Sequence, residues 1–557
     1  MTADGPPQGP PSPSPAGGPS LGRSAVVMAA GTTLSRVTGL GRLVAAAYAV
    51  GVTESRLADT YNIANTMPNV IYELVLGGVL TSIFIPVIVE ELRTRPKDEA
   101  WEAVSSVVTT AMTVLVAITL LAVVAAPVVI RLFTLRLSGA QAAQQQELAT
   151  FFLRVFAPQI VLYGFAAVAA GLLNAHDRFG VPMFAPILNN LVVIGAFLTF
   201  AALIHGTPTV PGVSGSLTQK LMLAVGTTAG VAAMALAHWP SLRRLPGKLR
   251  PTFQFRHPAV RKLARLSTGT FGYVITNQIG LAVALVLANG VQGGPTAYFM
   301  AFAFFQLPYG IATVSIMTAM VPTLSAQYVD GDVAGFRART AGGLRAMALL
   351  MIPATAVYLV LSRPLIRTLL EHGVMEAESS HLVASTLDTL AIGLLPFSAF
   401  LLLLRAFYAR QDTKTPMLIN IAGNLAYLVF SFALFPAFDV RGLGVAHTLC
   451  YAIAAALAGV LLARRVGGLE IRHTLREMVK ITGAAVVSAL AMATVVWTVA
   501  SAVGPGTTRS LIQLVLGGAL GLLTFLVAAR AIGVEDLSLF ARLLNRRKRD
   551  TGAATPG

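Results

Sequence analysis

Long apolar stretches recur along the whole chain, and this pattern constrains the fold more than any other feature. Fourteen stretches approach the roughly 20 residues that a helix needs to cross a bilayer, and none alternates like a membrane strand. Of the 557 residues, 55% are hydrophobic and 12% are charged, which excludes a soluble globular enzyme, a disordered chain and a secreted disulfide scaffold. We predict an all-α polytopic membrane protein with spans at about 25–52, 59–90, 103–132, 148–174, 183–204, 217–238, 262–289, 295–324, 341–362, 383–408, 416–436, 442–463, 479–501 and 509–532.

The distribution of Lys and Arg over the predicted loops indicates the orientation. With the N-terminus inside the cell, 28 of the 41 basic residues fall in inner segments and 8 in outer segments. This bias satisfies the positive-inside rule. An even number of spans then places both termini on the cytoplasmic side. Most of the formal net charge of +17 therefore reports topology.

An internal repeat divides the chain. Residues 175–190 align with 409–424, and Ala175, Asn190, Ala409 and Asn424 occupy matching places. Because six spans separate the two blocks, the repeats have the same topology, as in two-lobed transporters. We expect two six-helix lobes around a central cavity, followed by two C-terminal helices. The predicted division is a disordered Pro/Gly/Ser-rich tail (1–22), an N-terminal lobe (23–240), a C-terminal lobe (241–465), two further helices (466–541) and a basic cytoplasmic tail (542–557).

Two arginines, Arg36 and Arg42, fall inside the first predicted span. A charge at the bilayer centre costs about 2.5–3.5 kcal/mol, so we expect both side chains to line a wet cavity. They are separated by about 9 Å of rise and some 240° of turn on a straight helix, and the glycines at 39 and 41 permit a bend. Paired guanidinium groups suit a diphosphate. The alternative is that they extend to the membrane interface or pair with an acidic residue.

Two acidic residues of the second predicted span are candidates for the site. Asp59 opens the span and either binds substrate or caps the helix. Glu73 lies deeper and needs a cation partner or a raised pKa, and Arg36 or Arg42 is the natural partner. For both acids, binding and structural roles are open.

Three further charged residues are candidates for coupling or gating. Asp388 lies in the tenth span and could bind a coupling ion, while Arg178 and Arg410 lie in the short inner loops of the repeat. The loop charges fit gate contacts or turn chemistry. No Walker, HExxH or GxSxG motif is present in the sequence. We expect a transporter with no catalytic residue, metal, cofactor or nucleic-acid partner.

Four sequence strings in register resemble the MurJ (MviN) family. They are LSRVTGLGR (34–42), TMPNVIYELVLGG…IFIPV (66–87), GLLNAHDRFGVPMFAPILNN (171–190) and FYARQDTKTP (407–416). The resemblance covers about 24–465 and looks closest to the actinobacterial branch. It implies a lipid II flippase of the multidrug/oligosaccharidyl-lipid/polysaccharide exporter superfamily.

The resemblance also implies a mechanism and partners. Lipid-linked peptidoglycan precursor moves from the inner to the outer leaflet of the bacterial plasma membrane by alternating access. Arg36 and Arg42 match family arginines that hold the diphosphate, and Asp59 matches an acidic residue that opens helix two. Implied partners are lipid II, membrane lipids and cell-wall synthesis proteins.

The sequence departs from the family pattern at basic positions. Tyr72 and Glu73 follow the Pro-Asn of helix two, Leu43 follows the second arginine, and the stretch 301–305 is apolar. We therefore expect a less basic cavity. The alternatives are an exporter of another polyprenyl-linked glycan or of drugs, which would not need the helix-one arginines, and a non-transporting scaffold of cell-wall assembly, in which cavity substitutions would be silent.

Overall fold

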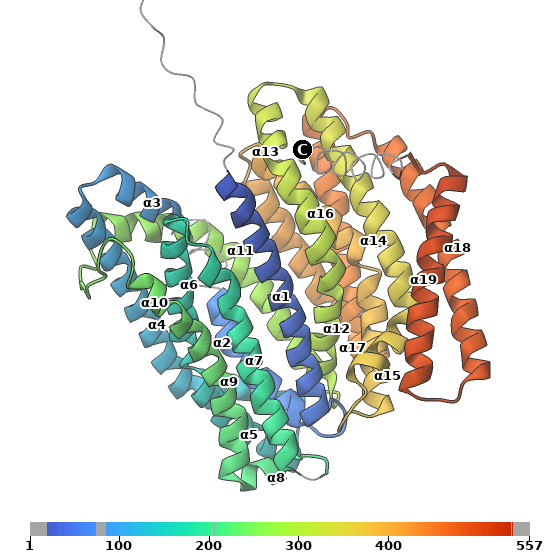
Figure 1. Cartoon of the computed structure of the whole chain (residues 1–557), viewed down its shortest axis with the longest axis horizontal. Coiled ribbons are helices and arrows are strands. Elements are labelled where there is room, and N and C mark those ends of the chain that lie inside the picture. The colour runs from blue at the N-terminus through green and yellow to red at the C-terminus, as the bar shows by residue number, and fades with distance from the viewer. Residues whose placement is uncertain (1–18, 74–84, 205, 536, 538–557) are drawn as a thin grey trace, which may run out of the picture.

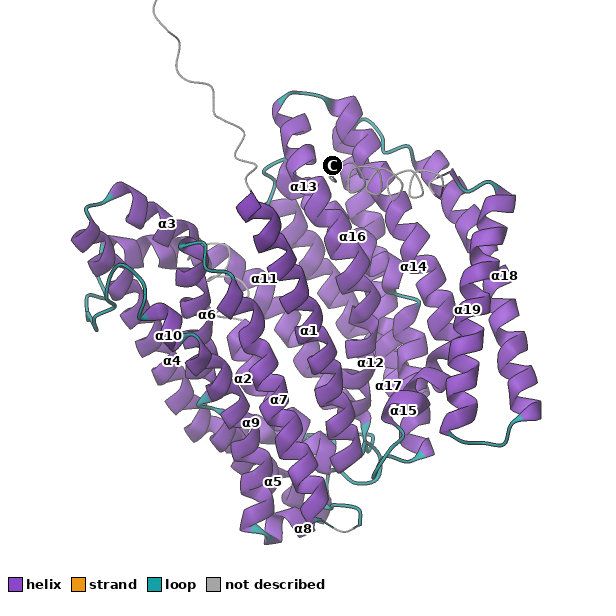
Figure 2. Ribbon diagram, in the orientation of Figure 1, coloured by secondary structure: helices purple, strands orange, loops and turns teal. Residues whose placement is uncertain are grey.

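The computed structural model describes residues 19–73, 85–204, 206–535 and 537. Its regular secondary structure is entirely helical over these residues (Figure 2), which confirms the predicted all-α class. The basic tail predicted at 542–557 and most of the tail predicted at 1–22 lie outside the described residues. The first helix begins at Pro19, so the last four positions of the predicted tail are helical.

Helices from the first half of the chain form the N-terminal lobe. They are α1 (Pro19–Val50), α2 (Leu57–Tyr72), α3 (Ile85–Thr94), α4 (Lys97–Phe133), α5 (Gly139–Phe156), α6 (Gln159–Ala175), α7 (Gly180–Leu203), α8 (Val210–Gly215), α9 (Leu217–Ala237) and α10 (Trp239–Leu242). Within this lobe, α1 packs mainly on α7, and α7 packs on α9.

The C-terminal lobe and two further helices complete the chain. They are α11 (Pro258–Ala288), α12 (Gly294–Pro308), the π-helix η2 (Tyr309–Thr313), α13 (Val314–Val329), α14 (Val333–Leu370), α15 (Ala377–Ala391), α16 (Leu394–Ala409), α17 (Lys414–Val466), α18 (Ile471–Ala502) and α19 (Thr507–Ile532). Helix α11 packs on both α4 and α17 and so contacts both lobes, whereas α18 and α19 pack on α14 at the outer edge.

Where the residues are described, the predicted apolar stretches correspond to helices or to helices in succession; positions 74–84 of the second stretch lie outside the described residues. Among the described residues, nine helical segments are long and apolar enough to cross a membrane, and the bent pair α15 and α16 makes a tenth. Helix α17 holds the eleventh and twelfth predicted stretches, joined at Asp439, whose φ of 52° and ψ of −138° interrupt the helix. Helices α5 and α6 form one span, as do α12, η2 and α13.

The two lobes lean apart in Figure 1, with α1 between them. We call the end at which α1 begins the upper end, and the end at which it finishes the lower end. The loops that follow α1, α11 and α14 all lie at the lower end.

The two loops of the internal repeat adopt the same turn. Asp177 and Gln411 occupy matching positions and have φ values of 57° and 59°. In each turn this residue donates its N–H to a carbonyl three residues back, and the next residue, Arg178 or Asp412, donates to a carbonyl five residues back. This is the Schellman pattern of helix ends. The shared geometry agrees with the repeat read from the sequence.

Candidate functional site

Asp59 joins the two lobes at the lower end. Its carboxylate is fully buried and accepts hydrogen bonds from the backbone N–H of Gly293 at 2.7 Å and of Thr296 at 3.2 Å. The Thr296 hydroxyl donates a third bond, at 2.7 Å. These donors belong to the first turn of α12, where unpaired N–H groups and the helix dipole favour an anion. Asp59 therefore caps a helix of the opposite lobe.

A second contact lies beside the first. The Oε1 atom of Glu54 accepts from the backbone N–H of Glu376 at 2.6 Å and from the hydroxyl of Ser379 at 2.7 Å. The Thr53 hydroxyl lies 2.8 Å from the same serine hydroxyl. We call the contacts of Asp59, Glu54 and Thr53 with the C-terminal lobe the lower latch. Further hydrogen bonds between the lobes gather at this end, among them those of Arg56 with Asn289 and of Asn62 with Thr296.

Arg36 faces a cavity between the lobes. The cavity measures about 460 Å³ and is lined by α1, by Pro182 and Met183 of α7, and by Gln306 of α12. The guanidinium reaches the C-terminal lobe, because a Cβ placed on Gly310 of η2 would lie 3.6 Å from Nη2. The side chain is exposed and forms no ion pair with another described residue. Arg36 is the charged residue of this cavity and is free to bind an anion.

Arg42 has different surroundings. It is partly buried and close enough to Tyr61 of α2 and Tyr163 of α6 to act on them electrostatically. It lies outside the cavity that Arg36 lines. Helix α1 runs without a break from Pro19 to Val50, so the turn between the two positions directs their side chains apart. In this state the arginines do not meet in one described cavity.

Glu73 lies at a larger cavity, of about 480 Å³, formed mainly by α11, α12, α16 and α17. Its wall carries Asn277, whose Oδ1 accepts from Nδ2 of Asn420 at 3.3 Å and of Asn424 at 2.8 Å. Glu73 extends from α2 to this cavity, and no ion pair joins it to Arg36 or Arg42 among the described residues. The pairing expected from the sequence is therefore not made in this state.

The candidate gate residues at the upper end make local contacts. Arg178 donates through Nη1 to the carbonyl of Ser241 at 3.4 Å. The guanidinium of Arg410 lies 5.3 Å from the ring centre of Tyr328 and so ties its loop to α13. Asp388 is elsewhere, in α15, where it faces α14 near Ser362.

Asp412, in the same loop as Arg410, is held by a network outside the spans. Its carboxylate accepts from the backbone N–H groups of Lys414 and Thr415 at 3.1 and 3.0 Å, and it pairs with Arg465. Burial alone would raise its pKa, but the hydrogen bonds of Thr415 and Arg465 outweigh burial and hold the pKa below its usual value of 3.8. The loop is therefore ordered by charge.

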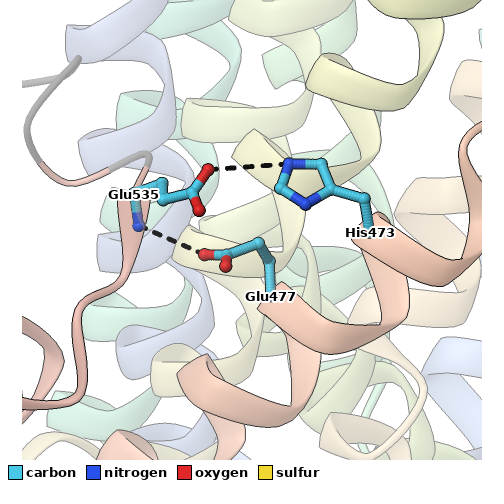
Figure 3. A group of neighbouring side chains, drawn as sticks. All are labelled: His473, Glu477 and Glu535. Atoms are coloured by element: carbon cyan, nitrogen blue, oxygen red, sulfur yellow. Dashed lines mark hydrogen bonds and ion pairs between the residues drawn. The ribbon is translucent and has the colours of Figure 1, made fainter.

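Among the described residues, one group of side chains could hold a metal ion by its geometry. The ligand atoms of His473, Glu477 and Glu535 lie within 4.8 Å of one another (Figure 3). The Glu477 carboxylate already accepts from Lys480 Nζ at 2.6 Å and from the Glu535 backbone N–H at 3.1 Å. These bonds fix the start of α18 to the segment after α19, so we read the group as a structural tie.

Comparison with known proteins places the chain. A family model described as lipid II flippase MurJ matches residues 46–517. The chain belongs to the MurJ family. The match confirms the family inferred from the four strings and places the chain among flippases rather than enzymes. It begins after Arg36 and Arg42, so the role of these two residues rests on their position in the structure.

MurJ relatives and solved structures cover most of the chain. A probable lipid II flippase MurJ of Haemophilus influenzae is 28% identical over 84% of this chain and 90% of its own length. A lipid II flippase MurJ of Burkholderia cenocepacia is 28% identical over 80% of this chain and 83% of its own length. A solved lipid II flippase MurJ in an inward closed conformation shares the fold, with a TM-score of 0.73, 21% identity and coverage of 91% and 99%. A solved MATE family transporter of the MOP superfamily, in an inward-facing conformation, also shares the fold, with a TM-score of 0.63, 14% identity and coverage of 80% and 99%.

The MurJ fold also contains site residues that the sequence did not reveal. Ala303, from the apolar stretch 301–305, lines the Arg36 cavity together with Gln306. The π-helix η2 brings Gly310 beside Arg36, and such helices are frequent at functional sites. The only signal in the sequence was the Pro-Tyr-Gly string. The partners of Asp59 lie 234 and 237 residues further along the chain, and no local sequence pattern predicts these contacts.

Proposed function

We propose that this chain moves lipid II from the inner to the outer leaflet of the bacterial plasma membrane by alternating access. The observation that carries the proposal is the Arg36 guanidinium, which pairs with no acidic residue in the described part of the chain and faces a cavity between the lobes of a MurJ-family fold. A planar guanidinium binds phosphate oxygens in pairs. The polyprenyl tail of the cargo would remain in the lipid while the diphosphate enters the cavity.

The orientation follows from the basic residues. Their excess in the loops of the upper end makes that end cytoplasmic, with both termini on the same side. The lower latch then lies on the outer face, and the state described is closed to the outside. A closed outer face with Arg36 accessible fits the state that receives cargo from the cytoplasmic leaflet.

The placement of the two arginines suggests a transfer between them. Arg36 lies about 21 Å and Arg42 about 12 Å above the lower end of α1, at 1.5 Å per residue. Arg36 would bind the diphosphate first. Rocking of the lobes would open the lower end and let the cargo pass to Arg42. Glu73, at the mouth of the larger cavity, would accept hydrogen bonds from the polar headgroup.

The remaining candidates have roles in the transition. Asp59 controls the passage of the cargo through the lower latch. Its carboxylate oxygens accept hydrogen bonds from Gly293 and Thr296 while the outer face is closed, so they do not bind the cargo in this state. Arg178 and Arg410 are placed to make the contacts that close the upper end after rocking. Asp388 is the proposed coupling site, between α15 and α14. Membrane lipids and cell-wall synthesis proteins are the proposed partners besides lipid II.

Complementation tests the function. A strain depleted of its own lipid II flippase should grow when supplied with this chain and should fail with Arg36→Ala or Arg42→Ala. Arg405→Ala is the matched control, since Arg405 is an exposed arginine within α16 that lines neither cavity. Rescue by both Arg36→Ala and Arg42→Ala would refute the diphosphate role. A scaffold would predict rescue by every folded cavity variant, and failure of the wild-type chain would refute the flippase assignment.

A further inference from the structure

A third cavity lies on the N-terminal lobe and shares no lining residue with the two described above. It measures about 460 Å³ and is formed by α4, α5, α8 and α9. Its charged lining residues are Arg131, Glu147, Arg154 and Lys220. The cavity therefore holds three cations and one anion. None of these four forms an ion pair with another described residue.

Arg154 is the unusual member, because it lies within a membrane span. It is exposed, and its Nε donates to the carbonyl of Val123 at 3.4 Å. Val123 is ten residues before the end of α4, which is about 15 Å of helix. A charge at such depth is expensive unless it meets an anion or water. The remaining guanidinium donors are available to a ligand in the cavity.

The cavity extends from this depth to the level at which the helices end. Arg131 lies two residues before the end of α4, and Lys220 three residues after the start of α9. The Lys220 ammonium lies 5.3 Å from the ring centre of Phe151. The Ser214 hydroxyl also lines the cavity, buried and without a hydrogen-bond partner among the described residues. Positive charge and a free hydroxyl thus meet at the depth of lipid headgroups.

An apolar surface continues from the cavity along α4. Leu121, Val124 and Val128 are exposed, with 76% exposure at Val124. Their spacing of three and four residues places them on one face of the helix, the side that acyl chains cover in a bilayer. On the other side of the cavity, Leu217 of α9 is also exposed. If the phosphate of a lipid binds the cations of the cavity, its hydrocarbon chain can lie along this exposed face of α4.

We propose that this cavity binds the phosphate of a membrane lipid, with Arg131, Arg154 and Lys220 holding its oxygens and α4 supporting its hydrocarbon chain. Guanidinium groups pair with phosphate oxygens in a fixed geometry, and lysine adds a point charge. Two sources carry this chemistry, an anionic phospholipid and a polyprenyl diphosphate. The site is independent of the Arg36 cavity, so it stands whether or not the chain flips lipid II.

Native mass spectrometry of the delipidated full chain tests the site. Phosphatidylglycerol, phosphatidylcholine or undecaprenyl diphosphate would be added in turn, and bound molecules counted at each concentration. We expect selective retention of an anionic lipid over phosphatidylcholine. Arg154→Gln should weaken that binding about tenfold, the value of one charge-assisted hydrogen bond, and the triple variant R131Q/R154Q/K220Q should weaken it more than a hundredfold. The anionic lipid that binds more tightly identifies the source.

Matched variants separate binding from folding. Arg509→Gln removes a cation at the start of α19, outside the cavity, and should leave binding unchanged. Arg154→Lys keeps the charge and should bind more tightly than Arg154→Gln. The anionic lipid should also raise the thermal unfolding temperature of the wild-type chain and of Arg509→Gln more than that of the triple variant. The proposal would be overturned if the wild-type chain retained phosphatidylcholine as well as it retains the anionic lipids. It would also be overturned if the triple variant bound both anionic lipids as tightly as the wild-type chain does.

Discussion

Replacing Asp59 by asparagine should loosen the lower latch and populate a state in which the lower end is open. The carboxylate is fully buried and is held by three donors from the opposite lobe, two on Thr296 and one on Gly293. Asparagine keeps the shape but has one acceptor oxygen, and its amide group would face N–H donors. The change therefore removes charge and hydrogen bonds without opening a void.

The size of the effect follows from the bonds. Hydrogen bonds to a charged group are worth about 1.5–3 kcal/mol and neutral ones about 0.5–1.5, so three bonds lose roughly 3 kcal/mol when the charge is removed. Desolvating the neutral amide is less costly than desolvating a carboxylate, which offsets part of the loss. We expect a net shift of about 2 kcal/mol, or about 30-fold in the ratio of open to closed molecules.

Spin-label distances measure this ratio. Labels at Thr207→Cys and Ala377→Cys, both exposed at the lower end of the two lobes, would be introduced after Cys450→Ala removes the single native cysteine. The Asp59→Asn variant should show a longer distance at the expense of the one that the unsubstituted chain shows.

The matched control is Asp332→Asn. Asp332 caps α14 by accepting from the backbone N–H of Gly335 at 2.8 Å, within one lobe. The Asp332→Asn substitution removes a capping charge but leaves every contact of the lower latch in place, so it should leave the distance distribution unchanged. An unchanged distribution in Asp59→Asn, or an equal change in the control, would refute the reasoning.

Three further predictions concern the latch, the inner loop and the break in α17. The pair Thr53→Cys and Ser379→Cys, whose native hydroxyls lie 2.8 Å apart, should form a disulfide in the cysteine-free background and block complementation until a reductant is added. Since the pKa of Asp412 is lowered on folding, its contribution to stability is present above its unfolded pKa and lost as the pH falls through the folded value. Unfolding temperatures measured below about pH 4 should therefore fall less steeply for Asp412→Asn than for the wild-type chain. A Cβ at Gly442 would lie 2.7 Å from a main-chain carbonyl oxygen, whereas one at Gly518 meets open space. Gly442→Ala should destabilise the fold by about 1–3 kcal/mol and Gly518→Ala should not, as thermal unfolding would show.

The fold was predictable because membrane helices are selected by length and apolarity, which are local properties. The break in α17 at Asp439 falls between predicted stretches that end at 436 and begin at 442, since Pro436 and Gly442 mark it. The π-helix η2 was not predictable. Its hydrogen-bond shift depends on packing against neighbouring helices rather than on composition.

The site was predictable where a charge stood out against an apolar background. Arg36 and Arg42 were found in this way, and the structure places Arg36 at an inter-lobe cavity. Their divergence is what a straight helix dictates, and the bend that Gly39 and Gly41 permit does not bring them together in this state. The partners of Asp59 could not be found, because its contacts join segments more than 230 residues apart.

The separation of the two arginines bears on how cargo could drive the lobes. A ligand shifts a two-state equilibrium only by its differential affinity for the two states, and moving it from 1:99 to 99:1 takes about 5.5 kcal/mol. If both guanidiniums held the diphosphate equally in both states, the cargo would shift nothing. In the proposed arrangement, the diphosphate reaches Arg36 while the latch is closed and reaches Arg42 only after the lobes have rocked. The hydrogen bonds to Arg42 are therefore formed only in the state with the lower end open. Charge-assisted hydrogen bonds of about 1.5–3 kcal/mol each then make two or three such bonds sufficient. On this reasoning Arg36→Ala loses cargo binding, whereas Arg42→Ala binds cargo and stays latched.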